Sequence, residues 1–554
     1  MTMTLNQQFY TLSSPFGPDF TELPNVMVLG LGESGTAMAK WCLAEGASVK
    51  IHDTRTEDQL SKEVLENAQK LKELGVLSIQ FGPEITSSEL EGIQILAVSP
   101  GMSPLQKPMK DLIGLAQERG YQVWGELEFF SQALKSLEIS AQYQAKVLAI
   151  TGTNGKTTTT ALTAAISARA GKRVAVAGNI SPSLLDKLME CLSFSEQNET
   201  PEALISKLPE IWVLELSSFQ LFYSQTFNPS VATVLNISQD HLDWHGDMTH
   251  YCESKAKIFG NDTIAVLNRD DSNVMGAVDL ARLDKNRTIT FGIDAPFEED
   301  SFGIVGDMAA GGFDWLAWVE PPEDLGTETK KRRRKSKDSA SEQAEPVRIK
   351  RLIPADALLI KGRHNAANAL AALSLAQAAG LAMGPLLHGL REYRGEPHRV
   401  QSVAIVNDVE YVDDSKGTNV GATIAALQGL GLAHGGSSDR PRLILIAGGV
   451  GKDQDFSPLA APIERFTKAV ILIGRDAPLI KQAIARVKTQ IIEASDMVEA
   501  VSAAANLAKA GDVVLLSPAC ASFDMFKDYA HRAHAFVEAI QELADNSHVI
   551  GGEQ

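Results

Sequence analysis

A short run of glycine, lysine and hydroxyl residues, T-G-T-N-G-K-T at 151–157, carries the strongest chemical signal in the sequence. It follows the apolar run V-L-A-I at 147–150 and precedes a segment rich in Thr and Ala. Backbone N–H groups of a glycine turn can surround a phosphate, and the N-terminus of the following helix adds a positive dipole end. Lys156 would then reach the β- and γ-phosphates of a nucleotide, and the Thr157 hydroxyl would ligate Mg²⁺. The alternative is an ordinary turn before a helix, but G-K-T-T directly after an apolar strand favours a phosphate loop.

Four further stretches downstream contain residues that could assist a phosphoryl transfer. They are L-E-L-S-S-F-Q with Glu215, N-I-S-Q-D-H-L-D with His241, Y-C-E-S-K-A-K with Lys255, and G-R-H-N-A-A-N-A-L with Asn365 and Asn368. Because Mg²⁺ prefers hard oxygen ligands, Thr157 and Glu215 suit one ion beside ATP. A lone Glu or His is more often structural. Four such motifs together after a phosphate loop favour a functional role instead.

The phosphate loop and the four stretches, in this order, resemble the central domain of Mur ligases. The longer phosphate-loop pattern is not met because position 150 is Ile, whereas the shorter form with Gly152, Gly155 and Lys156 is the variant of Mur ligases and folylpolyglutamate synthases. The resemblance implies a second Mg²⁺ that bridges ATP and a substrate carboxylate, with His241 as a ligand. It also implies that Lys255 is carbamylated; the alternative is an unmodified lysine paired with phosphate or an acid.

A second glycine-rich turn, G-L-G-E-S-G at 30–35, follows the apolar run V-M-V-L-G near the start of the chain. Taken alone, with Asp53 at the spacing of a ribose-binding acid, it indicates a nicotinamide or flavin oxidoreductase. In Mur ligases the same turn holds the pyrophosphate of a UDP-linked substrate. The resemblance implies these UDP-substrate contacts: Ser34, Asp53, Thr54, Arg55, Gly101 in S-P-G-M, Asn179 and His241.

The C-terminal part carries motifs that resemble the D-glutamate-adding branch of the family. They are P-H-R at 397–399, D-D-S-K-G-T-N at 413–419, G-G-V-G-K-D at 448–453 and S-P-A-C-A-S-F-D-M-F-K-D-Y at 517–529. Cationic and hydroxyl side chains suit the carboxylates of an incoming glutamate. The implied D-glutamate contacts are Lys416, Thr418, Lys452, Ser522, Phe523 and Tyr529, the last two standing where the family usually has Leu and Phe.

The resemblance implies an ATP-dependent, ADP-forming amide-bond ligase of peptidoglycan precursor synthesis. Its substrates would be UDP-N-acetylmuramoyl-L-alanine, D-glutamate and ATP, joined through an acyl phosphate. The implied ATP contacts are Gly152, Thr153, Asn154, Gly155, Lys156, Thr157, Thr158, Asn368, Arg399 and Asp414, and the implied catalytic residues are Lys156, Glu215, His241 and Lys255. Two rivals remain, a folylpolyglutamate-type ligase and a nucleotide-sensing binding module.

The elements that must position these residues are short apolar strands separated by helical stretches. This alternation predicts an α/β fold with parallel sheets. We expect three consecutive domains: a Rossmann-like N-terminal domain at 1–143, a central P-loop ATPase-type domain at 144–396 and a Rossmann-like C-terminal domain at 397–554. The segment 321–345 contains the basic run from Lys330 to Lys335, and we expect a solvated, disordered insertion rather than a nucleic-acid patch.

Composition sets the remaining expectations. The net charge of −18 argues against nucleic acid as a partner. The four cysteines are too far apart in sequence to suggest a metal clip or a redox pair, the N-terminus lacks the pattern of a signal peptide, and no apolar run has the length of a membrane span. We therefore expect a cytoplasmic protein, and a monomer.

Overall fold

The computed structural model describes residues 12–550 except 87, 194–199, 278–286, 308–312, 321–347, 361, 435–440 and 453. The basic insertion and the extreme N-terminus, on which two of the expectations rest, lie outside the described residues. Within the described part, no helix combines the length and the apolar character needed to cross a membrane. All four cysteines are free thiols.

The N-terminal unit is a parallel five-stranded sheet in the order β3-β2-β1-β4-β5. Its strands are β1 (Asn25–Leu29), β2 (Ser48–Asp53), β3 (Ser78–Phe81), β4 (Ile95–Val98) and β5 (Gln122–Trp124). Its helices are α1 (Glu33–Ala44), α2 (Lys62–Glu73), α3 (Met109–Glu118) and α4 (Glu126–Ala141). Strand β4 is buried along its whole length, as expected for a parallel sheet covered by helices.

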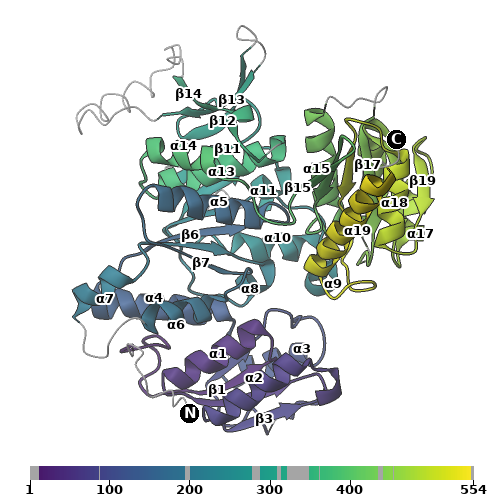
Figure 1. Ribbon diagram of the computed structural model, residues 1–554. Helices are drawn as coiled ribbons and strands as arrows, with labels where there is room; N and C mark the ends of the chain where they lie inside the picture. Colours follow the sequence, from purple (N-terminus) through teal and green to yellow (C-terminus); the bar gives the residue numbers. More distant parts are fainter. Residues whose placement is uncertain are drawn as a thin grey trace.

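The middle unit is built on a nine-stranded sheet in the order β14-β13-β12-β11-β10-β9-β6-β8-β7. Its parallel part comprises β6 (Lys146–Thr151), β7 (Val174–Gly178), β8 (Ile211–Glu215), β9 (Val231–Val234), β10 (Ile264–Asn268) and β11 (Thr288–Phe291). The helices described below are α5 (Lys156–Arg169), α6 (Leu184–Ser193), α8 (Ser218–Phe222), α9 (Leu242–His245), α10 (Met248–Ala256), α13 (Arg363–Ala378) and α14 (Met383–Glu392). Helices α5, α13 and α14 pack together over one face, and α6 lies toward the N-terminal unit (Figure 1).

An antiparallel extension completes this sheet and was not expected from the sequence. Strand β12 (Ser301–Asp307) joins the parallel part, and β13 (Phe313–Val319) and β14 (Ile349–Pro354) follow in antiparallel pairing. The ring of Phe302 stacks on that of Trp318 with centroids 5.7 Å apart. The three strands form the upper end of the molecule in Figure 1.

The C-terminal unit has a six-stranded sheet in the order β15-β16-β20-β17-β18-β19. Its strands are β15 (Gln401–Val406), β16 (Val409–Asp413), β17 (Leu443–Gly448), β18 (Thr467–Ile473), β19 (Gln490–Glu493) and β20 (Val513–Leu516). All neighbours are parallel except the hairpin β15–β16. The covering helices are α15 (Val420–Ala433), α16 (Ala460–Phe466), α17 (Ala477–Ala483), α18 (Met497–Leu507) and α19 (Tyr529–Ile550).

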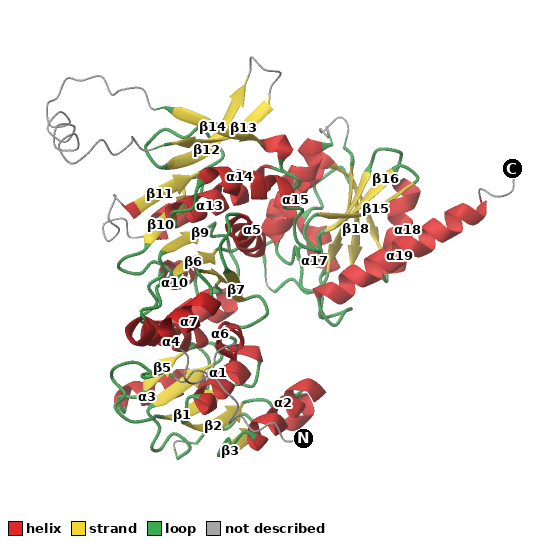
Figure 2. Cartoon of the chain, turned by 60° about the vertical axis from the view of Figure 1, so that its left-hand side comes forward, coloured by secondary structure: helices red, strands yellow, loops and turns green. Residues whose placement is uncertain are grey.

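The three units follow one another along the chain and confirm the expected α/β fold class with three parallel-rich sheets (Figure 2). The middle unit lies between the other two, with the C-terminal unit beside its α5–α13 face (Figure 1). The domain limits at 143/144 and 396/397 remain predictions.

Candidate active site

The glycine-rich loop 152–155 connects β6 to α5, so it lies beyond the carboxyl ends of the parallel strands. Gly155 precedes α5 with φ +80°, in the left-handed region that favours glycine. A Cβ at Gly155 would lie 2.6 Å from Oδ1 of Asn368. The site therefore needs a glycine here, and it brings Asn368 of α13 against the loop.

The segment after β9 fixes the shape of this loop. The Asn154 N–H donates to Oδ1 of Asn236 at 2.8 Å, and Nδ2 of Asn236 donates back to the Asn154 carbonyl at 3.0 Å. The Ser238 N–H donates to the Thr153 hydroxyl at 3.0 Å. Sequence reasoning missed Asn236 and Ser238, although both stand in the stretch that was singled out for His241.

Two lysine ammonium groups converge on the backbone of the loop. Lys156 Nζ donates to the carbonyls of Gly152 at 2.9 Å and Thr153 at 2.8 Å. Lys255 Nζ also donates to the Gly152 carbonyl at 2.9 Å and lies 4.6 Å from the ring centre of Tyr251. Only 2% of Lys255 is exposed, and this burial, with the nearby charge of Lys156, lowers the pKa of Lys255 well below its ordinary value.

Glu215, the last residue of β8, offers a buried carboxylate with an unused oxygen. Its Oε1 accepts from Nδ2 of Asn179 at 2.9 Å, whereas its Oε2 is buried without a hydrogen-bond partner. An unpaired buried carboxylate oxygen is costly unless a cation joins it. In the described part of the chain, no group of three or more His, Cys, Asp or Glu side chains could hold a metal ion.

His241 stands at the start of α9 with φ +54°, and its ring packs edge-on against Phe219 at 4.8 Å. Its Nε2 lies 3.5 Å from Oδ2 of Asp240. Burial lowers the pKa of His241, with Asp240 opposing that effect and neighbouring lysines reinforcing it. A neutral imidazole can act as a ligand or as a hydrogen-bond partner.

The C-terminal unit contacts the phosphate loop directly. Arg399 Nη2 donates to the Thr157 hydroxyl at 2.6 Å, and Asn419 Nδ2 donates to Oδ1 of Asn154 at 2.9 Å. Asp414 accepts from the Ser517 hydroxyl at 2.6 Å, and burial raises its pKa to about 7. Residues 414–419 therefore lie across the cleft from the phosphate loop.

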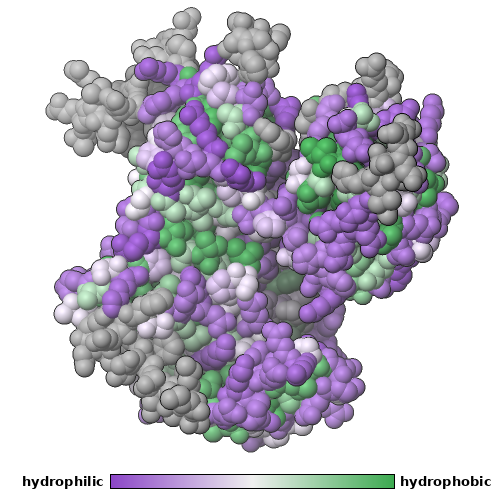
Figure 3. All heavy atoms as spheres, viewed as in Figure 1, coloured by the Kyte–Doolittle hydropathy of each residue, from purple (hydrophilic) through white to green (hydrophobic). Residues whose placement is uncertain are grey.

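A cleft of about 1340 Å³ runs between the middle and the C-terminal units. The surface in Figure 3 is hollowed where these units meet. Of the residues singled out from the sequence, the cleft is lined by Thr153, Asn154, Gly155, Lys156, Thr157, Thr158, Asn179, Glu215, His241, Asn365, Asn368, Arg399, Asp414, Lys416, Thr418 and Lys452. The others do not line it: Gly152, Lys255, Ser34, Asp53, Thr54, Arg55, Gly101, Ser522, Phe523 and Tyr529. Lys255 contacts the first residue of the loop, since its ammonium group donates to the Gly152 carbonyl.

The N-terminal glycine turn forms a separate cluster at the carboxyl ends of β1 and β2. Asp53 is buried; its Oδ2 accepts from the Leu31 N–H at 2.7 Å, and Arg55 pairs with both of its oxygens at 2.9 and 2.8 Å. The Ser34 hydroxyl donates to Oε2 of Glu126 at 2.7 Å. Thr54 is half-buried beside them, and Gly101 is exposed after β4, at the same edge of the sheet. Asp53 thus holds the turn in place, whatever it binds.

The remaining glutamate-site candidates gather near the start of α19. Lys416 Nζ lies 3.8 Å from the ring centre of Tyr529. Ser522 is buried, whereas Phe523 is 73% exposed. Phe523 therefore does not wall a closed pocket in this arrangement of the chain.

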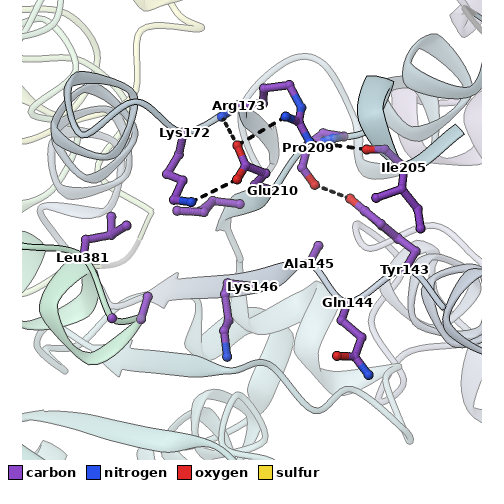
Figure 4. Close-up of a pocket in the computed structure, with 13 residues that line it drawn as sticks. Tyr143, Gln144, Ala145, Lys146, Lys172, Arg173, Ile205, Pro209, Glu210 and Leu381 are labelled. Carbon is purple, nitrogen blue, oxygen red and sulfur yellow. Dashed lines mark hydrogen bonds and ion pairs between the residues drawn. The ribbon is translucent and has the colours of Figure 1, made fainter. Parts of the chain in front are cut away.

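A second, smaller cavity of about 300 Å³ lies at the opposite ends of the strands (Figure 4). It includes Lys146 and Ile211, the first residues of β6 and β8. Its only carboxylate, Glu210, already pairs with Lys172 at 2.9 Å and with Arg173 at 3.4 Å. The residues with chemical potential gather instead at the large cleft.

Comparisons with known proteins agree with this geometry. Three family models match: the N-terminal domain of MurD-like Mur ligases at 24–125, the Mur ligase middle domain at 150–309 and the glutamate ligase domain of Mur ligases at 398–520. The fold resembles that of the UDP-N-acetylmuramate-alanine ligase of Thermotoga maritima, with a TM-score of 0.51 and 18% identity over 94% of this chain and 99% of that one. The MurF ligase of Thermotoga maritima, solved with ADP, gives a TM-score of 0.51 and 16% identity over 82% and 95%.

Two relatives are much more similar in sequence. The UDP-N-acetylmuramoylalanine--D-glutamate ligase of Cupriavidus pinatubonensis is 52% identical over 525 residues, 94% of this chain and 97% of the relative. The ligase of the same name from Ralstonia nicotianae is 50% identical over 537 residues, 97% of this chain and 98% of the relative. This likeness excludes the oxidoreductase suggested by Gly30–Gly35 alone, since it extends across all three sheets. The chain belongs to the Mur ligase family, in its group of UDP-N-acetylmuramoylalanine--D-glutamate ligases.

Proposed function

We propose that this chain joins D-glutamate to UDP-N-acetylmuramoyl-L-alanine at the expense of ATP, in the synthesis of peptidoglycan precursors. The observation that carries the proposal is the cleft in which the phosphate loop faces residues 414–419 of the C-terminal unit. Relatives that are about half identical to this chain, along nearly their full length, are named UDP-N-acetylmuramoylalanine--D-glutamate ligases. The cytoplasm, which supplies ATP, is the proposed compartment, and a monomer is the proposed state.

The reaction would proceed in two steps. The L-alanine carboxylate attacks the γ-phosphorus of ATP, the bond to the β-phosphate oxygen breaks, and ADP leaves. The D-glutamate amine then attacks the acyl carbon and loses a proton. Inorganic phosphate leaves and takes with it the carboxylate oxygen that had attacked the phosphorus. Lys156 would stabilise the charge on the phosphoryl group, and N–H groups at the start of α5 would hold the phosphates. Arg399 and Asp414 are proposed ATP contacts from the C-terminal unit, and Asn368 and Thr158 from the middle unit.

The residues around Glu215 fit a magnesium ion. Mg²⁺ is commonly held by one or two carboxylates together with substrate phosphates and water. Oε2 of Glu215 is buried and unpaired, and the Thr157 hydroxyl lies in the same cleft, so both could hold such an ion. When bound, Mg²⁺ would neutralise charge on the transferred phosphoryl group. His241 is the proposed protein ligand of a second ion.

Lys255 is the proposed site of carbamylation. Its burial disfavours the ammonium form, and a neutral amine is the form that reacts with CO₂. The nitrogen attacks CO₂, a proton leaves, and the product is an anionic carbamate. Carbamylation would thus replace a buried cation by an anion, whose oxygens could bind the second ion.

The substrate ends are proposed from the motifs. The UDP group would lie at the glycine turn near Ser34, Asp53, Thr54, Arg55 and Gly101, with Asn179 and His241 facing the substrate from the middle unit. D-Glutamate would contact Lys416, Thr418, Lys452, Ser522, Phe523 and Tyr529.

The test is phosphate release from ATP by the purified chain with UDP-N-acetylmuramoyl-L-alanine and either D- or L-glutamate. We expect release, and formation of the amide product, with D-glutamate only. Equal rates with both enantiomers, or release that needs no UDP-linked acceptor, would reject the proposal. A folate acceptor in place of the UDP substrate serves as the control for the folylpolyglutamate-type rival.

A further inference from the structure

A buried arginine on α19 connects the two loops that carry the proposed glutamate contacts. Arg532 is 1% exposed. Its Nη2 donates to the carbonyl of Ser415 at 2.8 Å, and its Nη1 donates to the carbonyl of Cys520 at 3.1 Å. Ser415 immediately precedes Lys416, and Cys520 lies two residues before Ser522. One side chain thus holds both loops by their backbones.

Other hydrogen bonds also join the two loops, close to the strands from which they emerge. The loops leave adjacent parallel strands, β16 and β20, at the pair Asp413 and Leu516. Beyond that point, the Ala519 N–H donates to the Gly417 carbonyl at 2.9 Å, and the Ser517 hydroxyl donates to Asp414. Arg532 adds two further bonds, one next to Lys416 and one two residues before Ser522.

The guanidinium group is well suited to this position. Its planar fork can donate to two acceptors at once, and it stays protonated although burial lowers its pKa to about 10. Its Nε is buried without a hydrogen-bond partner, while Nη1 and Nη2 donate to the two loop carbonyls. Tyr529 stands three residues earlier on the same helix and lies under Lys416. Residues three apart share one helix face, so one face of α19 supports the loop backbone and its lysine together.

We propose that Arg532 is a positioning residue for the amino-acid substrate, which sets the spacing between the 414–419 loop and the 517–523 loop. This rests on the proposed function, because it takes these loops as the D-glutamate site. The side chain lies behind the loops and acts through them. Its loss should therefore weaken D-glutamate binding while the ATP and UDP-substrate ends keep their affinity, because Asp414, the proposed ATP contact of the same loop, is held separately by the Ser517 hydroxyl.

The experiment compares Arg532→Lys and Arg532→Met with the full-length wild type. Phosphate release is measured against each of the three substrates, and the melting temperature is recorded. We expect the KM for D-glutamate to rise by about tenfold or more in Arg532→Met, and by about three- to tenfold in Arg532→Lys, because one ammonium cannot hold both carbonyls in the same geometry. The KM values for ATP and for the UDP substrate should stay within about twofold.

Two controls separate positioning from stability. Phe536→Leu loosens the packing of α19 against Tyr411 and removes no hydrogen bond to either loop, so it should lower the melting temperature and leave the KM for D-glutamate unchanged. Arg486→Met removes an exposed arginine of the same unit and should change nothing. The proposal is overturned if Arg532→Lys keeps a wild-type KM for D-glutamate, or if all three KM values rise together. A wild type without D-glutamate-dependent phosphate release would instead reject the proposed function.

Discussion

At the scale of single residues, the two lysines beside the Gly152 carbonyl have different surroundings. Lys156 lines the cleft, and its ammonium group donates to the carbonyls of Gly152 and Thr153. Lys255 lies behind the loop and is buried. The first is placed to meet a phosphate, and the second to accept a modification that removes its positive charge.

Replacing Lys156 by Met should abolish phosphoryl transfer. Removing one preorganised charge from a transition state commonly costs about 10²- to 10³-fold in kcat. We expect phosphate release to fall by at least that factor, with the fold retained. Lys172→Met is the matched control, since Lys172 belongs to the ion pair at the far end of the same sheet. Near-normal turnover of the Lys156 variant would contradict its role.

Carbamylation of Lys255 predicts an activity that depends on CO₂. Enzyme freed of CO₂ should lose activity and regain it on addition of bicarbonate, because the buried neutral amine re-forms the carbamate. Intact-mass analysis under carbonate-preserving conditions should show the added CO₂ in the wild type and not in Lys255→Met. An unmodified mass in fully active enzyme would contradict the prediction.

Tyr529 should act on glutamate binding through its ring rather than its hydroxyl. The Lys416 ammonium lies 3.8 Å from the ring centre, and a cation–π contact contributes about 0.5–2 kcal/mol. Tyr529→Phe should therefore keep the KM for D-glutamate, and Tyr529→Leu should raise it by about two- to thirtyfold. A Phe variant as weak as the Leu variant would show that the hydroxyl, not the ring, matters.

The motif residues of the site were predictable because their types stand at characteristic spacings. Glu215 ends an apolar strand, and Lys156 comes after the short loop that follows another, at the edge of a parallel sheet where ligands bind. Asn236 and Arg532 were not foreseen. Each binds backbone atoms of a segment that is remote in sequence, and no local pattern records such a partner.

At the scale of elements, the first turn of α4 holds an acid that connects two units. The buried carboxylate of Glu126 accepts from the Ser34 hydroxyl at 2.7 Å and from the Leu185 N–H of α6 at 2.9 Å. Burial raises the pKa of Glu126 to about 7. Ionisation is thus disfavoured in the folded state, so Glu126 costs stability where the unfolded chain has already lost the proton.

This sign predicts how stability changes with pH. Below the ordinary glutamate pKa the carboxyl is neutral in both states, and as the pH rises from about 4.5 to 7 the unfolded state is increasingly favoured. Glu126→Gln should match the wild type at about pH 4 and be more stable by about 1–3 kcal/mol at pH 8. The melting temperatures of both proteins across this range provide the measurement. A constant difference at all pH values would show that Glu126 does not titrate in this window.

Several parallel strands were predictable from their apolar runs, while the antiparallel extension formed by β12, β13 and β14 was not expected. Strands such as β4 and β17 are buried on both faces and therefore stand out as continuous apolar segments. In β13, residues 315–319 also form an apolar run, but the strand pairs with β14 across a long sequence gap. Such pairing depends on the register between two strands that are far apart in sequence, which the local sequence does not specify.

At the scale of the whole molecule, the cleft exists because the C-terminal unit meets the phosphate loop. Arg399 reaches Thr157, and Asn419 reaches Asn154. The sequence motifs predicted which residues belong to each side. The contact between the sides was not predictable, because it depends on the relative placement of two sheets joined through residues 392–401.

The side chain of Asn419 makes two hydrogen bonds with different roles, and substitutions can separate them. Its Oδ1 accepts from the Ala422 N–H and caps α15, while its Nδ2 donates to Asn154 across the cleft. Asn419→Ser keeps an oxygen for the cap and loses the donor, so it should lower kcat by about three- to tenfold with little change in melting temperature. Asn419→Ala loses both and should also destabilise the C-terminal unit by about 1 kcal/mol. If the Ser variant keeps the wild-type kcat, the bond to Asn154 does not help to hold the two units in their reactive arrangement, and Arg399 remains the contact to test.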